Sequence, residues 1–399
     1  MSAPLPMLPG QSRIAITGGT GHLGAALVHH LVSRGHPPTN VRVIYLPGST
    51  TAAVDPIPGL DLHPADILDP DAAHTCIAGA THVFHVAGNT SFVPARRRAQ
   101  WLVNVEGTRN ICDACLASPS FVRLVHTGTV NVLGIPSPAG SLGDESTSPY
   151  HSPRRIHTFS SPAEALALAD AVHERRAPDG WWKKLAVGYF DSKLAADELV
   201  ARYVQEHGLP AVRVLPGTLF GPHDRLVGNG IYILQVRRNA IPAYVTSAGL
   251  PLTHVLDQAE GHVLAMERGS VGQRYILGGR SQDNLPLSQM LAIIADVLRE
   301  QEPGRKVRTP RIPLPWTAAY AGAAAVELFS ALLGRTPLLT RAAVLAGSFP
   351  SFYSSAKARR ELGYDPQRSF RDAVADMTRD YRAAGLLDAT QRTVDREKP

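Results

Sequence analysis

The feature that most constrains the fold of this chain is a glycine-rich turn near its N-terminus, TGGTGHLG, over residues 17–24. Gly18, Gly21 and Gly24 stand three residues apart, between a β-branched run, RIAIT (13–17), and a segment with helical apolar spacing. Glycine permits the unusual backbone angles of such a turn, close approach of a pyrophosphate and tight packing of helix on strand. The helix N-terminus then offers free N–H groups to an anion. The pattern predicts a dinucleotide-binding unit.

Strand-like and helix-like segments alternate along the first half of the chain. Strands that alternate with helices form a parallel sheet with right-handed crossovers. We therefore expect an α/β fold, with a Rossmann-type doubly wound parallel sheet over residues 12–217 and a smaller, mostly helical substrate lobe over 218–390. The predicted strands are RIAIT (13–17), VRVIYL (41–46), LDLHPAD (60–66), HVFHVAG (82–88), FVRLVHTGT (121–129), LPAVRVLPG (209–217) and RYILGG (274–279).

Charge and cysteine content exclude several classes of protein. The net charge of +6 is spread along the chain, and short basic runs such as 96–98 carry no aromatic ladder, so we expect no nucleic-acid partner. Three cysteines cannot form a disulfide framework. Cys112 and Cys115 form a C-x-x-C inside a predicted helix, where burial is favoured over a zinc or redox role. The histidines show no metal-ligand spacing, so no metal is expected.

Two segments bear on location. The N-terminus has no charged start followed by an apolar run, so no signal peptide is predicted. Residues 316–334, WTAAYAGAAAVELFSALLG, approach membrane-spanning length with a single charge, Glu327. Because the segment is rich in alanine, we expect a packed helix of the second lobe rather than a transmembrane segment or a membrane contact. A cytoplasmic location follows from these expectations.

Tyr189 and Lys193 lie four residues apart in GYFDSKLAADELVARYVQEHG, which has helical spacing, so both side chains share one face. A phenol has a pKa of about 10, and a neighbouring ammonium lowers it by stabilising the phenolate. The same lysine is placed to hold a nicotinamide ribose. The pair therefore indicates proton transfer beside a nicotinamide cofactor.

Together these motifs resemble those of the extended short-chain dehydrogenase/reductase family, also called the NAD-dependent epimerase/dehydratase superfamily. The turn resembles TGxxGxxG and the pair resembles YxxxK; PADILD (64–69), HVAG (85–88), NVEGT (104–108), HTGTV (126–130) and RVLPGTLFGP (213–222) follow in the family's order. VHTGTVNVLG and THVLDQAEGHVLAMERGSVGQRYILGG resemble the dihydroflavonol-reductase-like branch. The likeness covers most of residues 12–280 and implies an NAD(P)-dependent oxidoreductase.

The resemblance also assigns roles to residues. Thr129 stands where the family usually has a catalytic serine, with Thr127 a second candidate, beside the catalytic pair Tyr189 and Lys193. Asn104 either orders a proton-relay water or packs structurally. The residues implied in cofactor binding are Gly18, Thr20, Gly21, His22, Leu23, Tyr45, Asp66, Ile67, Val86, Ala87, Gly88, Thr127, Lys193, Pro216 and Thr218. The candidate substrate contacts are Asn89, Asn131, Trp181, Trp182 and His254, the last of which is equally explained as a hydrogen-bonded structural residue.

The chain departs from the family pattern between its catalytic elements. Thr129 and Tyr189 are 60 residues apart, beyond the usual interval, because of an insertion over residues 151–187. Trp181 and Trp182 in this insertion either line a pocket for a large apolar substrate or pin the insertion to the protein body. No Asp-Glu pair directly follows Thr129, which counts against the sugar-nucleotide dehydratases of the family.

The cofactor preference depends on the end of the second strand. Many NAD-binding domains place an acid there to bind the ribose hydroxyls, whereas this strand ends Tyr45-Leu46-Pro47. The following Ser49, Thr50 and Thr51 can hydrogen-bond a 2′-phosphate, with His22 or Arg42 nearby. This favours NADP(H) over NAD(H).

We predict an enzyme that interconverts a ketone and a secondary alcohol on a hydrophobic small molecule. One alternative is an NAD-dependent sugar-nucleotide epimerase, which the missing acid disfavours. Another is a catalytically dead cofactor-binding scaffold, against which the intact Tyr189 and Lys193 argue. The resemblance leads us to expect a homodimer.

Overall fold

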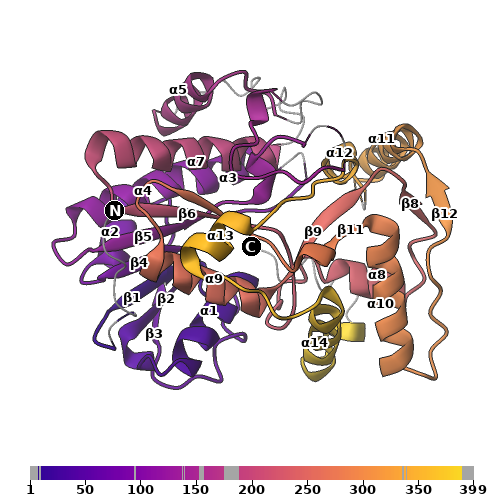
Figure 1. Cartoon of the computed structure of the whole chain (residues 1–399), viewed down its shortest axis with the longest axis horizontal. Coiled ribbons are helices and arrows are strands. Elements are labelled where there is room, and N and C mark those ends of the chain that lie inside the picture. The colour runs from indigo at the N-terminus through magenta and orange to yellow at the C-terminus, as the bar shows by residue number, and fades with distance from the viewer. Residues whose placement is uncertain are drawn as a thin grey trace.

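The centre of the molecule is a seven-stranded, fully parallel sheet with the strand order β10-β6-β5-β4-β1-β2-β3. The computed structural model describes residues 8, 10–93, 96–136, 138, 140–151, 157–174, 188–334, 337 and 339–388. Helices cover both faces of the sheet (Figure 1), so the predicted Rossmann-type α/β fold is confirmed. The strands are β1 (Ile14–Thr17), β2 (Val41–Tyr45), β3 (Asp61–Pro64), β4 (His82–His85), β5 (Arg123–Thr127), β6 (Ala211–Pro216) and β10 (Arg274–Leu277).

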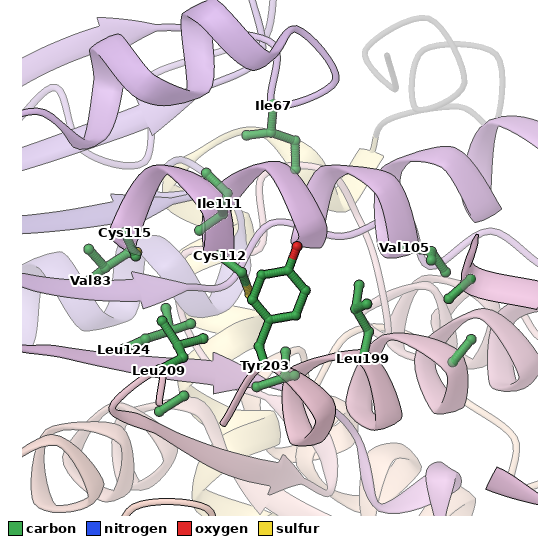
Figure 2. Packing of buried hydrophobic residues seen from close by; sticks show 14 of the residues in the cluster. Ile67, Val83, Val105, Ile111, Cys112, Cys115, Leu124, Leu199, Tyr203 and Leu209 are labelled. Carbon is green, nitrogen blue, oxygen red and sulfur yellow. The ribbon is translucent and has the colours of Figure 1, made fainter. Parts of the chain in front are cut away.

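Each face of the sheet has its own apolar core. On one face β-strand side chains pack with helices α2 (Pro70–Ile77), α4 (Gly107–Ala117), α5 (Pro162–His173) and α7 (Gly188–His207). On the other they pack with α1 (His22–Ser33), α9 (Val255–Arg268) and α13 (Ala356–Leu362). Cys112 and Cys115 lie on the inner side of α4 near Tyr203 of α7 (Figure 2), and burial raises the pKa of both thiols. The prediction that they are buried helix residues is confirmed.

Within the described residues, the second lobe contains two small sheets and five α-helices. One sheet has the order β11-β9-β7 and the other pairs β12 with β8. Its strands are β7 (Thr218–Phe220), β8 (Ala243–Val245), β9 (Gly249–His254), β11 (Asn284–Pro286) and β12 (Ile312–Leu314), and its helices are α8 (Ile231–Arg237), α10 (Leu287–Gln301), α11 (Trp316–Leu332), α12 (Arg341–Gly347) and α14 (Phe370–Ala383).

The chain after residue 217 contributes to both parts of the molecule. The core of the second lobe gathers around Phe220, Met290 and Phe370, on β7, α10 and α14. Between β7 and α10 in the sequence, α9 packs on the large sheet. Strand β10, in the same stretch, pairs with β6 and forms an outer strand of the large sheet. The chain therefore crosses between the two parts more than once, and the domain boundary at residue 217 stays a prediction.

The structure corrects one expectation about the second lobe. Residues 316–332 do form a helix, α11, but Ala323 is its only residue classed as buried in the described part of the chain. Leu332 is 74% exposed, and the helix contacts α12 along one side while the rest of its surface faces outward. The expected packed helix of the second lobe is therefore packed along one side only. No helix among the described residues is both long and apolar enough to cross a membrane.

Candidate active site

The glycine turn lies between β1 and α1 and leaves no room for side chains. Gly18 has a φ of +67°, and a Cβ on it would lie 2.8 Å from the Cα of Ala87. A Cβ on Gly24 would lie 2.1 Å from the carbonyl oxygen of Gly18. The N-cap of α1 is Gly21, whose lack of a side chain leaves the first N–H groups of the helix uncapped. This arrangement fits a pyrophosphate, with Thr20, His22 and Leu23 in the turn that would surround it.

Of the two residues expected near a 2′-phosphate, Arg42 lies elsewhere and His22 begins α1 beside the turn. Arg42 is near the start of β2, where its guanidinium donates to Asp61 and to the carbonyl groups of Cys76 and Ala78. Since the turn meets the opposite end of the strand, the expectation that Arg42 assists a 2′-phosphate is wrong. The ring of His22, at the start of α1, lies 3.2 Å through Nε2 from the carbonyl oxygen of Gly221 and thus contacts the second lobe.

Residues at the carboxyl ends of β2, β3 and β4 lie beside the turn. Tyr45 ends β2, and Asp66 follows β3 with its carboxylate accepting a hydrogen bond from the N–H of Leu68. Ile67 packs closely against α4, where a Cβ on Gly107 would lie 2.6 Å from its Cδ1 atom. Ala87, after β4, donates its N–H to Thr17 Oγ1 at the end of β1. Ligands of open α/β sheets bind at these strand ends.

Tyr189 lies in the first turn of α7 and forms a hydrogen bond with Thr129, which follows β5. Burial raises the pKa of Tyr189 to about 12, although the hydrogen bond from Thr129 opposes that rise. The expectation that Lys193 lowers this pKa is not met in the chain itself, because burial of the phenol outweighs other influences. Thr129 also accepts a hydrogen bond from the N–H of Asn131 at 3.3 Å, which holds its hydroxyl in place.

Lys193 lies one turn further along α7 and is buried. Its ammonium donates to the carbonyl oxygen of Thr127, at a distance of 2.8 Å. Burial lowers the pKa of Lys193 to about 8, while the carboxylate of Asp197 opposes that decrease. A Cβ on Gly88 would lie 3.4 Å from the lysine Nζ, so this glycine keeps the space in front of the ammonium open.

Asn104 orders the backbone in front of this space. It lies in a π-helical turn over Leu102–Glu106, between α3 (Arg97–Trp101) and α4. Its amide oxygen accepts from the N–H of Asn89, and its amide nitrogen donates to the Asn89 carbonyl and to Ser192 Oγ. π-helical turns occur often at functional sites. Asn104 thus positions Gly88 and Asn89. The sequence had left two roles open for Asn104, structural packing and the ordering of a proton-relay water.

Thr127 at the end of β5 and Thr129 just after it face different surroundings. The Thr127 hydroxyl lies 3.2 Å from Nε2 of His262, on α9, whereas the Thr129 hydroxyl meets Tyr189. Only Thr129 therefore presents its hydroxyl to the tyrosine. Pro216 ends β6, the strand next to β5 in the large sheet, and Thr218 begins β7, a strand of the second lobe's three-stranded sheet.

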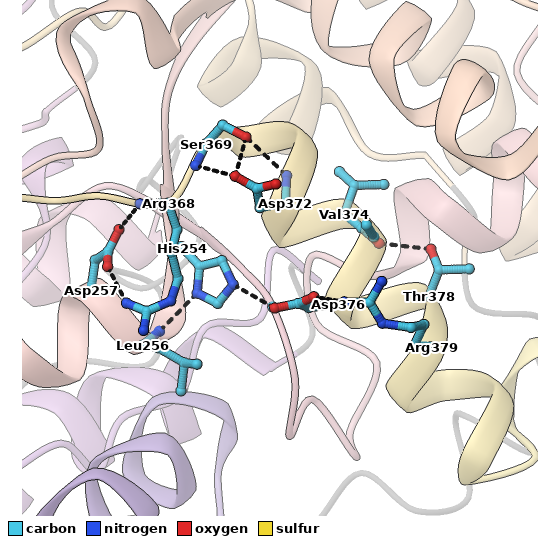
Figure 3. A network of polar contacts seen from close by, with 12 residues as sticks. His254, Leu256, Asp257, Arg368, Ser369, Asp372, Val374, Asp376, Thr378 and Arg379 are labelled. Atoms are coloured by element: carbon cyan, nitrogen blue, oxygen red, sulfur yellow. Dashed lines mark hydrogen bonds and ion pairs between the residues drawn. The ribbon is translucent and has the colours of Figure 1, made fainter. Parts of the chain in front are cut away.

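His254 is tied into the protein on both sides of its ring (Figure 3). Nδ1 accepts a hydrogen bond from the N–H of Leu256 at the start of α9, and Nε2 lies 3.2 Å from a carboxylate oxygen of Asp376. The ring is fully buried, and burial lowers its pKa. Of the two alternatives for His254, the structure shows the hydrogen-bonded one. Trp181 and Trp182 lie outside the described residues.

An apolar cluster surrounds Tyr189, and sequence reasoning did not find it. Its members come from four segments that are distant in sequence, so no local pattern indicates that they are neighbours. Phe92 meets the tyrosine ring edge-on at 5.4 Å, and Leu345 and Phe349 come from α12 and the loop after it. The apolar cluster consists of Ile135, Phe190 and Phe349, with Phe92, Tyr189 and Leu345 packed against them.

A buried polar row lies under the same site, on the face of the sheet toward α4 and α7. His85 and His126 are neighbours on β4 and β5, with ring centres 5.5 Å apart. Burial and the charge of Lys193 lower the pKa of His85 to about 3 and that of His126 far below its usual value. Both rings are therefore neutral, which leaves Lys193 as the charged group there. Within the described residues, no group of three or more His, Cys, Asp or Glu side chains is placed to hold a metal ion.

Comparison with known proteins gives consistent matches. The model of the NAD dependent epimerase/dehydratase family matches residues 14–160 and 151–278. A putative dihydroflavonol 4-reductase of Synechocystis is 32% identical over 93% of this chain and 95% of its own length. Sterol demethylase protein B of Methylococcus capsulatus is 26% identical, covering 93% of this chain and 99% of that protein. The crystal structure of gox2253 is similar with a TM-score of 0.71 and 30% identity, over 94% of this chain and 99% of that one.

Proposed function

This chain belongs to the NAD-dependent epimerase/dehydratase family and is an NAD(P)-dependent oxidoreductase, and we propose that it interconverts a ketone and a secondary alcohol on a hydrophobic small molecule. The observation that carries this proposal is the Thr129–Tyr189 hydroxyl pair set against the apolar cluster. Such surroundings favour an apolar substrate with one polar group at the hydroxyl pair. The names of two relatives, a putative dihydroflavonol 4-reductase and a sterol demethylase protein B, refer to polycyclic small molecules, which supports a substrate with a large ring system.

The proposed reaction gives separate roles to Tyr189, Thr129 and Lys193. With a pKa near 12, Tyr189 keeps its proton at neutral pH, so it can donate that proton to a carbonyl oxygen. Thr129 shares the hydrogen bond and holds the same oxygen. A bound nicotinamide supplies or accepts the hydride at the carbonyl carbon. Lys193, anchored by the Thr127 carbonyl, would hold the hydroxyls of the nicotinamide ribose.

The cofactor would lie along the carboxyl ends of the strands, from the glycine turn to Lys193. We propose NADP(H) as the preferred form, because no Asp or Glu occurs between residues 45 and 54 to repel a 2′-phosphate. The proposed contacts are Gly18, Thr20, Gly21, His22, Leu23, Tyr45, Asp66, Ile67, Val86, Ala87, Gly88, Thr127, Lys193, Pro216 and Thr218. The ratio of the Kd values of NADPH and NADH, measured by fluorescence titration, tests the preference.

The experiment for the reaction uses purified full-length protein with NADPH and a panel of cyclic apolar ketones, alongside UDP-sugars. We expect NADPH oxidation with a ketone and none with the UDP-sugars. Tyr189→Phe should lower kcat at least 100-fold while the Kd of NADPH stays within threefold, since only the proton donor is lost. Full activity of Tyr189→Phe, or epimerisation of a UDP-sugar without net NADPH oxidation, would overturn the proposal.

A further inference from the structure

The outer surface of α11 carries no charge at all. Every exposed position of this 17-residue helix is apolar, small or hydroxyl-bearing. Leu328, Phe329 and Leu332 are 61%, 64% and 74% exposed, and Leu333 just beyond the helix is 66% exposed. Below we call these positions the outer face: Thr317, Ala318, Tyr320, Ala321, Gly322, Ala325, Leu328, Phe329, Ala331 and Leu332.

The single charge of α11 points the other way. The more buried positions, among them Trp316, Ala319, Ala323 and Glu327, recur every three or four residues and so form the stripe that faces the protein. Glu327 pairs there with Arg341 of α12 and is 17% exposed. A surface helix of a globular protein normally shows the reverse pattern, with its charges outward. The outer face therefore needs a partner.

We infer that the outer face of α11 docks on the surface of a lipid bilayer that contains anionic lipids. At about 1.5 Å per residue the 17-residue helix is about 25 Å long, too short for a hydrocarbon core of about 30 Å. It would lie flat at the interface with its apolar side chains inserted. Tyr320 provides an aromatic side chain of the kind that favours the headgroup level.

The charge beside the helix matches an anionic surface. The segment that leads into β12 and α11, which we call the basic segment, carries Arg305, Lys306, Arg308 and Arg311, all exposed. Residues 302–334 contain these four basic residues and two acidic ones, Glu302, which pairs with Arg305, and Glu327, which pairs with Arg341. The positive charge that no acidic residue of this stretch pairs with is therefore that of Lys306, Arg308 and Arg311. Basic residues next to an interfacial helix attract anionic headgroups. Figure 1 shows β12 and α11 together at the end of the second lobe remote from the large sheet.

The same charges disfavour a second copy of this chain as the partner. In a two-fold dimer each patch meets its own copy. The basic segment would then lie near a basic segment, and like charges brought together across an interface cost binding energy. An anionic bilayer satisfies both the apolar outer face and the flanking positive charge.

The outer face is also connected to the active site. The ring of Trp316, at the start of α11, lies 6.3 Å from that of Phe349, which belongs to the apolar cluster around Tyr189. A set of apolar side chains thus runs from the protein-facing stripe of α11 to the tyrosine. Such a path suits a hydrophobic substrate taken from the bilayer, an aspect that rests on the proposed function.

The test is co-flotation of the full-length protein with vesicles of phosphatidylcholine, with or without 30% phosphatidylglycerol. We expect binding to the anionic vesicles that falls at least fivefold in 0.5 M NaCl. The double variant F329E/L332E should bind at least tenfold less. The matched control is Leu142→Glu, at a 58% exposed leucine in another part of the chain, which should bind as the wild type does. Unchanged melting temperatures and NADPH affinities would show that the variants are folded.

Several results would overturn the inference. The first is that the wild type does not float with the vesicles, and the second is that F329E/L332E floats as well as the wild type. The third is that the wild type is a dimer, the double variant is a monomer, and neither protein binds vesicles. Equal binding to neutral and anionic vesicles would overturn the role of the basic segment. Tyr189→Phe should lose turnover but keep vesicle binding, so failure of docking and failure of the proposed reaction give different results.

Discussion

Lys193→Met should make the protein more stable at pH 7 while abolishing its activity. Lys193 is charged and only 6% exposed, and burial lowers its pKa from 10.5 to about 8. Each unit of pKa difference corresponds to about 1.4 kcal/mol, so charging the folded lysine costs about 3 kcal/mol. The variant loses the hydrogen bond to the Thr127 carbonyl, worth about 1–2 kcal/mol with the oxygen left unsatisfied. The net gain is therefore about 1–2 kcal/mol.

The gain should depend on pH with a defined sign. Between pH 8 and 10.5 the unfolded chain binds a proton at Lys193 that the folded protein has released, so wild-type stability rises with pH through that window. The cost of the buried charge is fully present below pH 8 and gone above 10.5. Lys193→Met is thus the more stable protein at pH 7 and the less stable one near pH 10.5, where only the lost hydrogen bond remains.

Calorimetric melting of both proteins at pH 7 and pH 10 measures this difference. For 399 residues at about 2 cal/mol/K each, a gain of 1–2 kcal/mol raises the Tm by roughly 2 °C. The matched control is Lys306→Met, at an exposed lysine, which should change stability by less than about 0.5 kcal/mol. A Lys193→Met variant that is less stable at pH 7, or a difference that does not vary with pH, would refute the buried charge as its cause.

Two further substitutions test the site. Gly24→Ala should raise the Kd of NADPH at least tenfold and lower the Tm, because its Cβ would lie 2.1 Å from the Gly18 carbonyl oxygen. The control is Gly322→Ala, in open space on α11, which should raise the free energy of unfolding by up to about 1 kcal/mol. Thr129→Val should lower kcat about 100-fold, and Thr129→Ser should restore most of it. Thr127→Val keeps the backbone carbonyl that anchors Lys193 and loses only a hydroxyl that faces His262 of α9, so its kcat should stay within a few fold of the wild type. Equal kcat losses in the two valine variants would contradict the assignment of Thr129.

The parts that the sequence predicts well are those encoded locally. The glycine turn needs only a strand, three glycines and a helix in order, and the structure shows that turn. Tyr189 and Lys193 lie on one helix, so a spacing of four residues suffices to place them together. The alternation of strands and helices likewise predicts a parallel sheet, because the periodicity of each element is visible within the element.

The parts that could not be predicted depend on distant contacts. The apolar cluster around Tyr189 includes Phe92, Ile135 and Phe349, and the first and last of these are more than 250 residues apart in the sequence. No local pattern marks them as neighbours. Burial and the charge of Lys193 together lower the pKa of the neighbouring His85. A sequence does not show which side chains are buried, so it does not predict this shift. For α11, composition indicates a helix, but whether a helix is covered depends on which other elements reach it.

The position of β10 at the edge of the large sheet has a consequence for synthesis on the ribosome. Strand β6 ends at Pro216 and its partner β10 begins at Arg274, so 57 residues must be added before β6 is covered. At roughly 5–20 residues per second, translation leaves that strand edge open for about 3–12 s. An open parallel edge is a template for pairing with other nascent chains. Truncated chains that stop between these strands should therefore need chaperones, even though they contain the whole glycine turn and the catalytic pair.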